Sequence, residues 1–181
     1  MHADTQSLLT RARELEHELE QTRRLLAGLP SQATRSATLN VVTFSVADLK
    51  FAVPVTHVDE VVPSARLLHV PRAPGFIPGA LEIDAELVPI LDLGLYMGRT
   101  AHNTALDDSL VLCSVEGHRL GLCAISLPTL VEVDAALVSA PPSEYAGAPY
   151  VVAWLASGDE PILLLGMLSL LMTARLPEVL S

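Results

Sequence analysis

The stretch VPRAPGFIPGALEIDAELVPILDLGLYMG, residues 70–98, decides the fold class because it combines closely spaced turn residues with apolar runs of strand length. Three prolines and two glycines fall within residues 71–79, which excludes a helix and indicates consecutive tight turns. From Leu81 to Leu87, apolar and acidic residues alternate, as in a strand with one buried and one solvated face. Residues 88–93 are almost all apolar, which is typical of a strand buried on both faces.

Further short strands, separated by turn residues, are predicted along the rest of the chain. This spacing indicates a β-barrel or a sandwich and argues against βαβ units. Two short helices are expected among the strands, at residues 56–62 and 167–174. The predicted strands span residues 40–46, 50–54, 81–93, 109–115, 119–125, 151–156 and 162–165.

Composition and charge narrow the class of protein. The 181 residues suit one domain with a short appendage, and half of them are apolar. A net charge of −10 repels phosphate backbones and anionic lipids, so nucleic acid is not an expected partner. Residues 1–13 lack the apolar segment of a secretory signal, and the 14-residue apolar run at 161–174 is too short to span a membrane. We therefore expect a cytoplasmic protein without membrane insertion.

The chain divides into four parts on this evidence. Residues 1–30 are expected to form an amphipathic helix, because residues 5–27 contain no Gly or Pro and are rich in helix formers. The polar segment SQATRSAT, residues 31–38, is a predicted linker. Residues 39–175 are expected to form the globular domain, and residues 176–181 a C-terminal tail.

The N-terminal helix carries two apolar rows with a seven-residue repeat, which is the a/d pattern of a coiled coil. Two threonines and one alanine weaken the seam, and about three heptads are marginal for self-association. Two interpretations stay open. The seam could form a homodimer, and in the extreme case the protein would be a purely structural coiled-coil oligomer. Alternatively, the helix lies on the domain or on a partner. The predicted self-association residues are Leu8, Leu15, Leu19 and Leu26.

The order of four segments resembles the CheW-like adaptor domain of bacterial chemosensory systems, and the resemblance covers nearly everything from Leu39 onward. It implies a mainly β fold of two packed five-stranded SH3-like barrels, with no catalytic activity and no cofactor. Family members link chemoreceptor tips to the regulatory domain of the CheA histidine kinase, so these are the implied partners. The four segments are VVTFSVADLKFAVPVTHVDEVV (41–62), HVPRAPGFIPGALEIDAELVPILDL (69–93), SLVLCSVEGHRLGLCAI (109–125) and VVAWLASGDEPILLLGMLSLL (151–171).

The resemblance also suggests partner-binding residues. Val58 and Val61, with Leu127 and Leu130, match positions that line or border the apolar groove for the receptor hairpin in the family. Glu60 lies with the two valines in a V-x-E-V motif that is expected to be helical. The alternative for the four apolar residues is ordinary core, because grooves and cores use the same residue types.

One motif departs from the family. Members commonly carry Asn-Leu-Arg-Gly where this chain has Glu82, Ile83, Asp84 and Ala85. Replacing an interface Arg by an acid changes attraction into repulsion, worth about 1–3 kcal/mol, or about tenfold to a hundredfold in affinity. The missing Gly also removes easy access to positive φ at Ala85. An alternative function follows: a divergent member that binds only one of the two partners and modulates or insulates the array.

Glu82, Asp84 and Glu86 have the spacing that places three carboxylates on one face of a strand. This row could be a solvated face, a contact for a partner with a basic patch, or a divalent metal site. The last option defines a competing class, a metal-dependent enzyme or sensor. The chain carries no nucleophile elbow, no phosphate-binding loop and no His pair with ligand spacing, so we expect no catalytic and no metal-binding residues.

The two cysteines flank a predicted hairpin turn at residues 116–119. The register of the hairpin decides whether Cys113 and Cys123 face each other, since a shift of one residue moves a side chain to the other face. We expect reduced, buried thiols, as in most cytosolic proteins. The alternative is a redox bridge.

Overall fold

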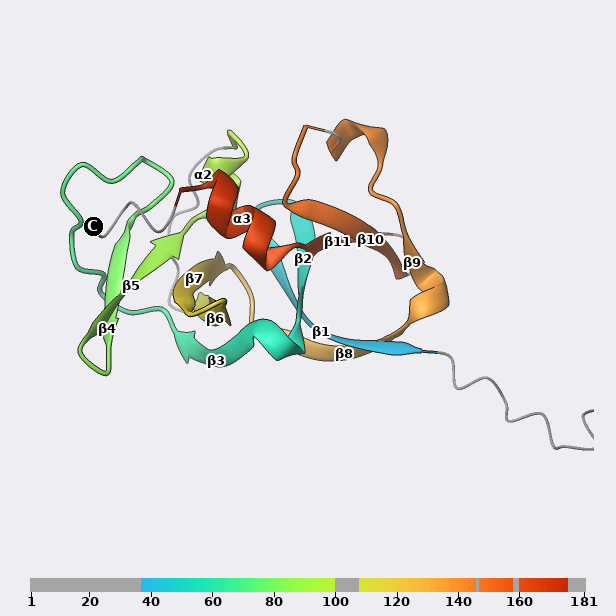
Figure 1. The fold of residues 1–181 in the computed structure, drawn as a ribbon, viewed down its shortest axis with the longest axis horizontal. Helices are drawn as coiled ribbons and strands as arrows, with labels where there is room; N and C mark the ends of the chain where they lie inside the picture. The colour runs from blue at the N-terminus through green and yellow to red at the C-terminus, as the bar shows by residue number, and fades with distance from the viewer. Residues whose placement is uncertain (1–36, 100–107, 146, 158–159, 176–181) are drawn as a thin grey trace, which may run out of the picture. The chain divides into compact units, whose positions relative to one another are not determined.

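Two curled β-sheets form the computed structural model, which describes residues 37–99, 108–145, 147–157 and 160–175 (Figure 1). Sheet A contains β1 (Thr38–Val46), β2 (Leu49–Pro54), β8 (Thr129–Asp134), β9 (Val138–Ser139), β10 (Val151–Ser157) and β11 (Glu160–Leu165). Sheet B contains β3 (Val58–Pro63), β4 (Gly79–Ile83), β5 (Glu86–Leu91), β6 (Ser109–Val115) and β7 (His118–Ala124). The short helices are η1 (Val55–His57), α2 (Leu93–Tyr96), η2 (Ala135–Leu137), η3 (Ser143–Tyr145) and α3 (Met167–Thr173).

The chain begins sheet A with β1 and β2, builds all of sheet B, and then returns to complete sheet A. The strand order is β8-β1-β2-β11-β10-β9 in sheet A and β3-β6-β7-β5-β4 in sheet B. Each sheet contains one parallel pair, β2 with β11 and β5 with β7, which joins segments that are not consecutive. The expected mainly β fold with two packed subdomains is confirmed. The two-residue β9 adds a sixth strand to one of the two expected five-stranded units.

The central strands bury both faces, each in a different core. In β11, Leu163 and Leu165 face a core shared by the two sheets, whereas Ile162 and Leu164 face the interior of sheet A. The strands of sheet B alternate in the same way, with Val111 in the shared core and its neighbours in the interior of sheet B. This period of two explains why the strands read as nearly continuous apolar runs.

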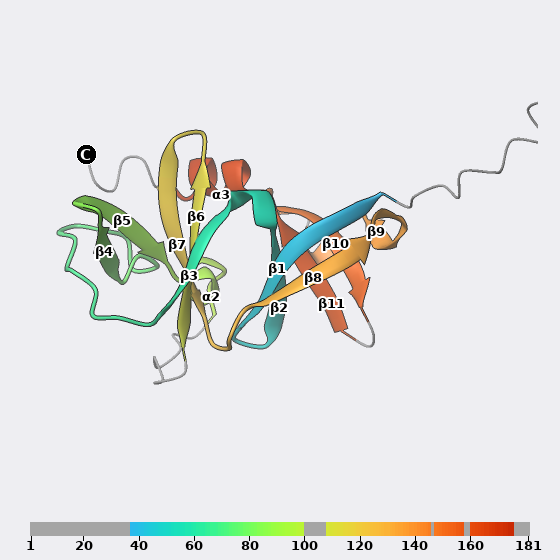
Figure 2. The same ribbon diagram turned by 90° about the horizontal axis from the view of Figure 1, so that it is seen from below.

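Helix α3 covers the boundary between the sheets (Figures 1 and 2). Its residues Met167, Leu170 and Leu171 are buried in the shared core beside side chains from both sheets. The helix predicted at 167–174 is therefore confirmed. Because one apolar cluster receives side chains from sheet A, sheet B and α3, the two sheets are packed as one unit.

The helix expected at residues 56–62 is wrong. Only Val55–His57 form a helical turn, and β3 follows at once as a strand paired with β6. The valines of this segment fit a strand better than a helix, because β-branched side chains lose rotamer freedom in a helix. The ladder with β6, which lies some 50 residues later, decides between the two and is invisible in the local pattern.

The strand boundaries expected within Leu81–Leu93 are also wrong, because the break between the two strands lies at residues 84–85 and not between residues 87 and 88. Asp84 and Ala85 have φ values of 53° and 66° and form a two-residue turn between β4 and β5. Positive φ at both central residues is the geometry that matches the twist of the flanking strands. Ala85 adopts this conformation although the missing Gly removes easy access to it, since the two-residue hairpin requires it. Strand β8 was not predicted, and it pairs with β1 along six residues.

Residues 1–36 and 176–181 lie outside the described residues. The predicted N-terminal helix with Leu8, Leu15, Leu19 and Leu26, most of the predicted linker and the C-terminal tail therefore stay predictions. The first strand already begins at Thr38, the last residue of the expected linker. Within the described ranges, no helix has the length and apolar character needed to cross a membrane.

Candidate partner-binding surfaces

The candidate partner-binding residues occupy three regions of the surface. Val58, Glu60 and Val61 lie on β3, which is one edge of sheet B. The hairpin β4–β5, with its acidic residues, forms the other end of the same sheet. Leu127 and Leu130 lie before and on β8, which is an edge of sheet A.

The two leucines at β8 are strongly exposed. Leu127 is 77% exposed and Leu130 is 65% exposed, so neither belongs to the core. The opposite face of the strand packs inward, with Val131 and Val133 against the interior of sheet A. An edge strand with large apolar side chains in solvent is a surface suited to protein contacts.

The residues of β3 differ from one another in their surroundings. Val58 is half-buried and packs against the shared core, whereas Val61 is 38% exposed and Glu60 is exposed. The ladder with β6 has an irregularity between Val58 and Glu60, which marks a bulge at Asp59. Val58 therefore contributes to packing, and Glu60 and Val61 are the residues of this group that a partner could reach.

The acidic row predicted on one strand face does not exist, because the turn at Asp84 separates Glu82 on β4 from Glu86 on β5. Glu82 and Asp84 are exposed, whereas Glu86 faces Arg119 on the neighbouring strand β7. In the part of the chain that the structure describes, no three His, Cys, Asp or Glu side chains lie close enough to hold a metal ion.

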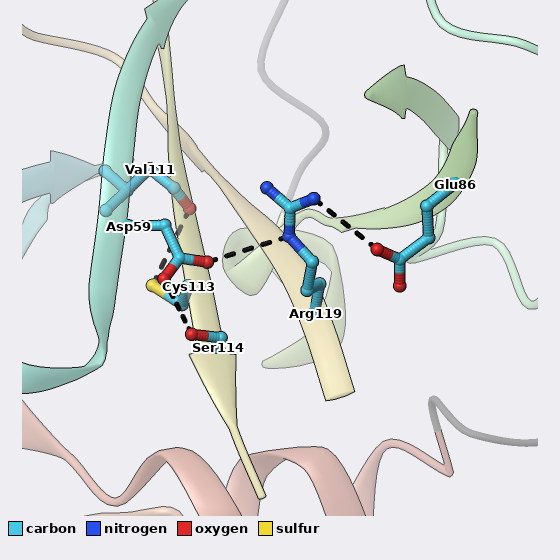
Figure 3. A network of polar contacts seen from close by, with 6 residues as sticks. All are labelled: Asp59, Glu86, Val111, Cys113, Ser114 and Arg119. Atoms are coloured by element: carbon cyan, nitrogen blue, oxygen red, sulfur yellow. Dashed lines mark hydrogen bonds and ion pairs between the residues drawn. The ribbon is translucent and has the colours of Figure 1, made fainter. Parts of the chain in front are cut away.

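Four side chains from four successive strands of sheet B form a polar network (Figure 3). Asp59 on β3 accepts a 2.6 Å hydrogen bond from the Ser114 hydroxyl on β6. Arg119 on β7 lies with Nε 3.7 Å from the Asp59 carboxylate and with a terminal nitrogen 3.4 Å from the Glu86 carboxylate on β5. Sequence reasoning missed this network. The sequence feature that could have indicated it is Arg119, which is the one Lys or Arg within the five strands of sheet B.

The cysteines lie on opposite faces of sheet B. Cys113 pairs with Leu120 and Leu110 pairs with Cys123, so the two thiols do not face each other and both are free. Burial, with a smaller contribution from Asp59, raises the pKa of Cys113 to about 12. Burial, then Asp92 and Asp108, raises the pKa of Cys123 to about 12. The expectation of reduced thiols holds, with Cys113 buried and Cys123 half-buried.

An open groove of about 660 Å³ lies between η1, the β6–β7 turn and the start of α3. A more enclosed cavity of about 370 Å³ lies beside α2, with Cys123 in its wall. Val58, Val61, Leu127 and Leu130 line neither of these two hollows. The structure therefore does not bring the four predicted groove residues together in either of them.

Comparisons with known proteins agree with this architecture. Residues 40–175 match the family model of the CheW-like domain. Protein FrzA of Myxococcus xanthus is 31% identical over 135 residues, which cover 73% of this chain and 84% of FrzA. The scaffolding protein TtCheW from Thermoanaerobacter tengcongensis has the same fold, with a TM-score of 0.66 at 21% identity over 71% of this chain and 89% of TtCheW.

The paired sheets and these likenesses define a scaffold protein of chemotaxis-type signalling. The chain belongs to the CheW-like family. Proteins of this family are non-catalytic scaffolds.

Proposed function

We propose that this protein is a non-catalytic, cytoplasmic adaptor that couples a chemoreceptor to a CheA-type histidine kinase. The observation that carries the proposal is the exposure of Leu127 and Leu130 at the edge of sheet A, at 77% and 65%. A charged hairpin on sheet B provides a second surface of different chemistry. A protein that joins two different partners needs two such surfaces.

Scaffolding explains how such a molecule transmits a signal without chemistry of its own. The shared core packs side chains from both sheets into one cluster, and close-packed interiors deform little. Partners bound to β8 and to the β4–β5 hairpin would therefore be held in fixed relative positions. A change of state in the receptor then alters the contacts of the kinase through a stiff intermediary.

The second candidate function is a divergent adaptor that binds only one of the two partners and modulates or insulates the array. Asp84 favours it, because the exposed turn carries an acid where family members commonly carry Arg. Inversion of that charge weakens a contact built for Arg by about 1–3 kcal/mol. Such a protein would bind a partner with a basic patch and reject the ordinary one.

Self-association is a further part of the proposal. The a/d rows with Leu8, Leu15, Leu19 and Leu26 support a homodimer through the N-terminal helix. Deletion of residues 1–30 should then lower the mass in solution from that of a dimer to that of a monomer. An unchanged number of chains per particle after the deletion would refute the coiled-coil dimer.

The test of the proposed function is calorimetric titration of the full chain with a purified chemoreceptor tip and, separately, with the regulatory domain of a CheA-type kinase. Binding of both partners supports the coupling function, and binding of one supports the divergent adaptor. Asp84→Arg is expected to improve binding of the weaker partner about tenfold to a hundredfold. Asp84→Asn is the control that removes the charge without reversing it. Absence of binding to both partners would refute the proposal.

A further inference from the structure

The three carboxylates of the β4–β5 hairpin are not equivalent, because one of them is engaged within the domain. The Glu86 carboxylate lies 3.4 Å from a terminal nitrogen of Arg119, while Glu82 and Asp84 are exposed at the hairpin. The Arg119 side chain is only 22% exposed, compared with 53% for that of Glu86. Arg119 is therefore held against the sheet, and Glu86 is drawn toward it.

The sheet order explains how one arginine reaches both sides. Strand β5 runs parallel to β7, with Ile90 opposite Gly121, so both strands begin at the same end of sheet B. Arg119 pairs with Ser114 in the β6–β7 hairpin, and Ser114 in turn donates to Asp59 on β3. The guanidinium thus lies between the carboxylates of Asp59 and Glu86, as Figure 3 shows.

This arrangement has a consequence for the charge that a partner meets. Without a nearby cation, the hairpin would present three unpaired carboxylates to a partner. Arg119 partly neutralises the carboxylate of Glu86. Exposed charges separated by more than about 8 Å are largely screened at physiological salt, so the pairing matters locally. The hairpin then offers Glu82 and Asp84, one on the edge strand β4 and one in the turn.

We propose that Arg119 is a positioning residue for partner recognition, which engages Glu86 inside the domain and leaves Glu82 and Asp84 as the carboxylates that a partner's cationic side chains meet. The inference rests on the proposed function, since it assigns the specificity of the same hairpin. The fitting partner surface carries two basic side chains placed for an edge strand and a turn.

A double-mutant cycle tests this inference. Glu86→Gln, Arg119→Gln and the double variant are titrated with whichever of the two partner domains binds the wild-type chain. Glu86→Gln should weaken binding about threefold to tenfold, because Arg119 is then left with Asp59 as its partner and the net charge of the Asp59, Arg119 and position 86 group rises from −1 to 0 beside the hairpin. Arg119→Gln should bind at least as tightly as the wild type. The double variant should return to within about twofold of the wild-type Kd, because the local net charge is restored.

Two results of the cycle would overturn the inference. If Glu86→Gln weakens binding by the same factor with and without Arg119, then Glu86 itself contacts the partner. If all variants lose affinity in proportion to their loss of melting temperature, and Arg119→Lys restores both, then Arg119 only supports the fold.

A readout on the free protein separates this inference from the proposed function. Compared with the wild-type chain, the Glu86→Gln variant should show shifted NMR resonances of the Arg119 guanidinium. The control variant Glu82→Gln should leave these resonances in place. If the wild type binds neither partner, the proposed function fails while the shift still reports the Arg119–Glu86 pair. If Glu86→Gln leaves the resonances unmoved in a chain that does bind a partner, the inference fails alone.

Discussion

Sheet A and sheet B share one construction and differ in what they expose. Each has a parallel strand pair, and each contributes alternate side chains to the shared core. On the exterior, sheet A presents Leu127 and Leu130 at an edge strand, whereas sheet B presents a charged network and an acidic hairpin. The interior therefore fixes the architecture, and the exterior is free to specialise each half for a different partner.

The shared core is the feature whose loss would break this comparison most severely. Phe51 on β2 is fully buried in it, so Phe51→Ala should destabilise the protein by about 3–5 kcal/mol. Urea unfolding followed by fluorescence and by circular dichroism should give one coincident transition. Leu137→Ala, at an exposed site on η2, is the control and should cost less than about 1 kcal/mol. Two separate transitions in the wild type would show that the sheets unfold independently.

The apolar exterior of sheet A is tested by Leu130→Asp. If Leu130 is a central contact, the variant should lose at least about 2 kcal/mol of partner binding, or about 30-fold in Kd, without loss of stability. Leu137→Asp places the same charge at an exposed leucine on η2, between β8 and β9, and should leave the Kd nearly unchanged. Equal effects of the two variants in titration calorimetry would contradict a specific role for β8.

The thiols of sheet B predict a loss of stability at alkaline pH, and Cys113 on the face toward the shared core tests it. Burial raises the pKa of Cys113 from 9.0 to about 12, so between these values the unfolded chain loses a proton that the folded chain retains. Stability therefore falls as pH rises, by up to about 1.4 kcal/mol per pH unit for this thiol. Cys113→Ala should remove that part of the slope between pH 9.5 and 11 in urea titrations. An unchanged slope would contradict a raised pKa of Cys113 in the folded chain.

The smallest effect is expected at two hairpin turns, one in each sheet, that hold an alanine at positive φ. Ala47 in sheet A and Ala85 in sheet B have φ values of 52° and 66°. Because Gly adopts this region without steric cost, Ala47→Gly and Ala85→Gly should each stabilise the protein by up to about 1 kcal/mol. Ala136→Gly, at an exposed site outside the left-handed region, should instead destabilise it. Melting temperatures of the three variants give the comparison, and a loss of stability at Ala85 would show that its turn is not strained.

The sequence was sufficient for the elements whose signal is local. The alternation of apolar residues located most strands, and the apolar run at residues 167–174 located α3. It failed where a distant ladder decides the conformation. Residues 58–63 form a strand because they pair with β6. Asp84 and Ala85 form a turn because β5 pairs antiparallel with β4.

The sequence identified individual surface residues, but it did not show which of them lie together in the fold. Leu127, Leu130 and Asp84 were recognised from the family resemblance, and the structure exposes all three. The link between Asp59, Arg119 and Glu86 was missed, because these residues are 27 to 60 positions apart in sequence and meet only through the strand order of sheet B. Pairing across strands that are not consecutive is information that a linear pattern does not contain.

The most direct test of the central claim is analytical ultracentrifugation of the full chain mixed with a chemoreceptor tip and a kinase regulatory domain, singly and together. An adaptor with two distinct docking surfaces should sediment with both at once, and Leu130→Asp should release one partner while the other stays bound. If the two partner domains displace each other, or if neither sediments with the chain, the claim of separate docking surfaces on the two sheets is contradicted.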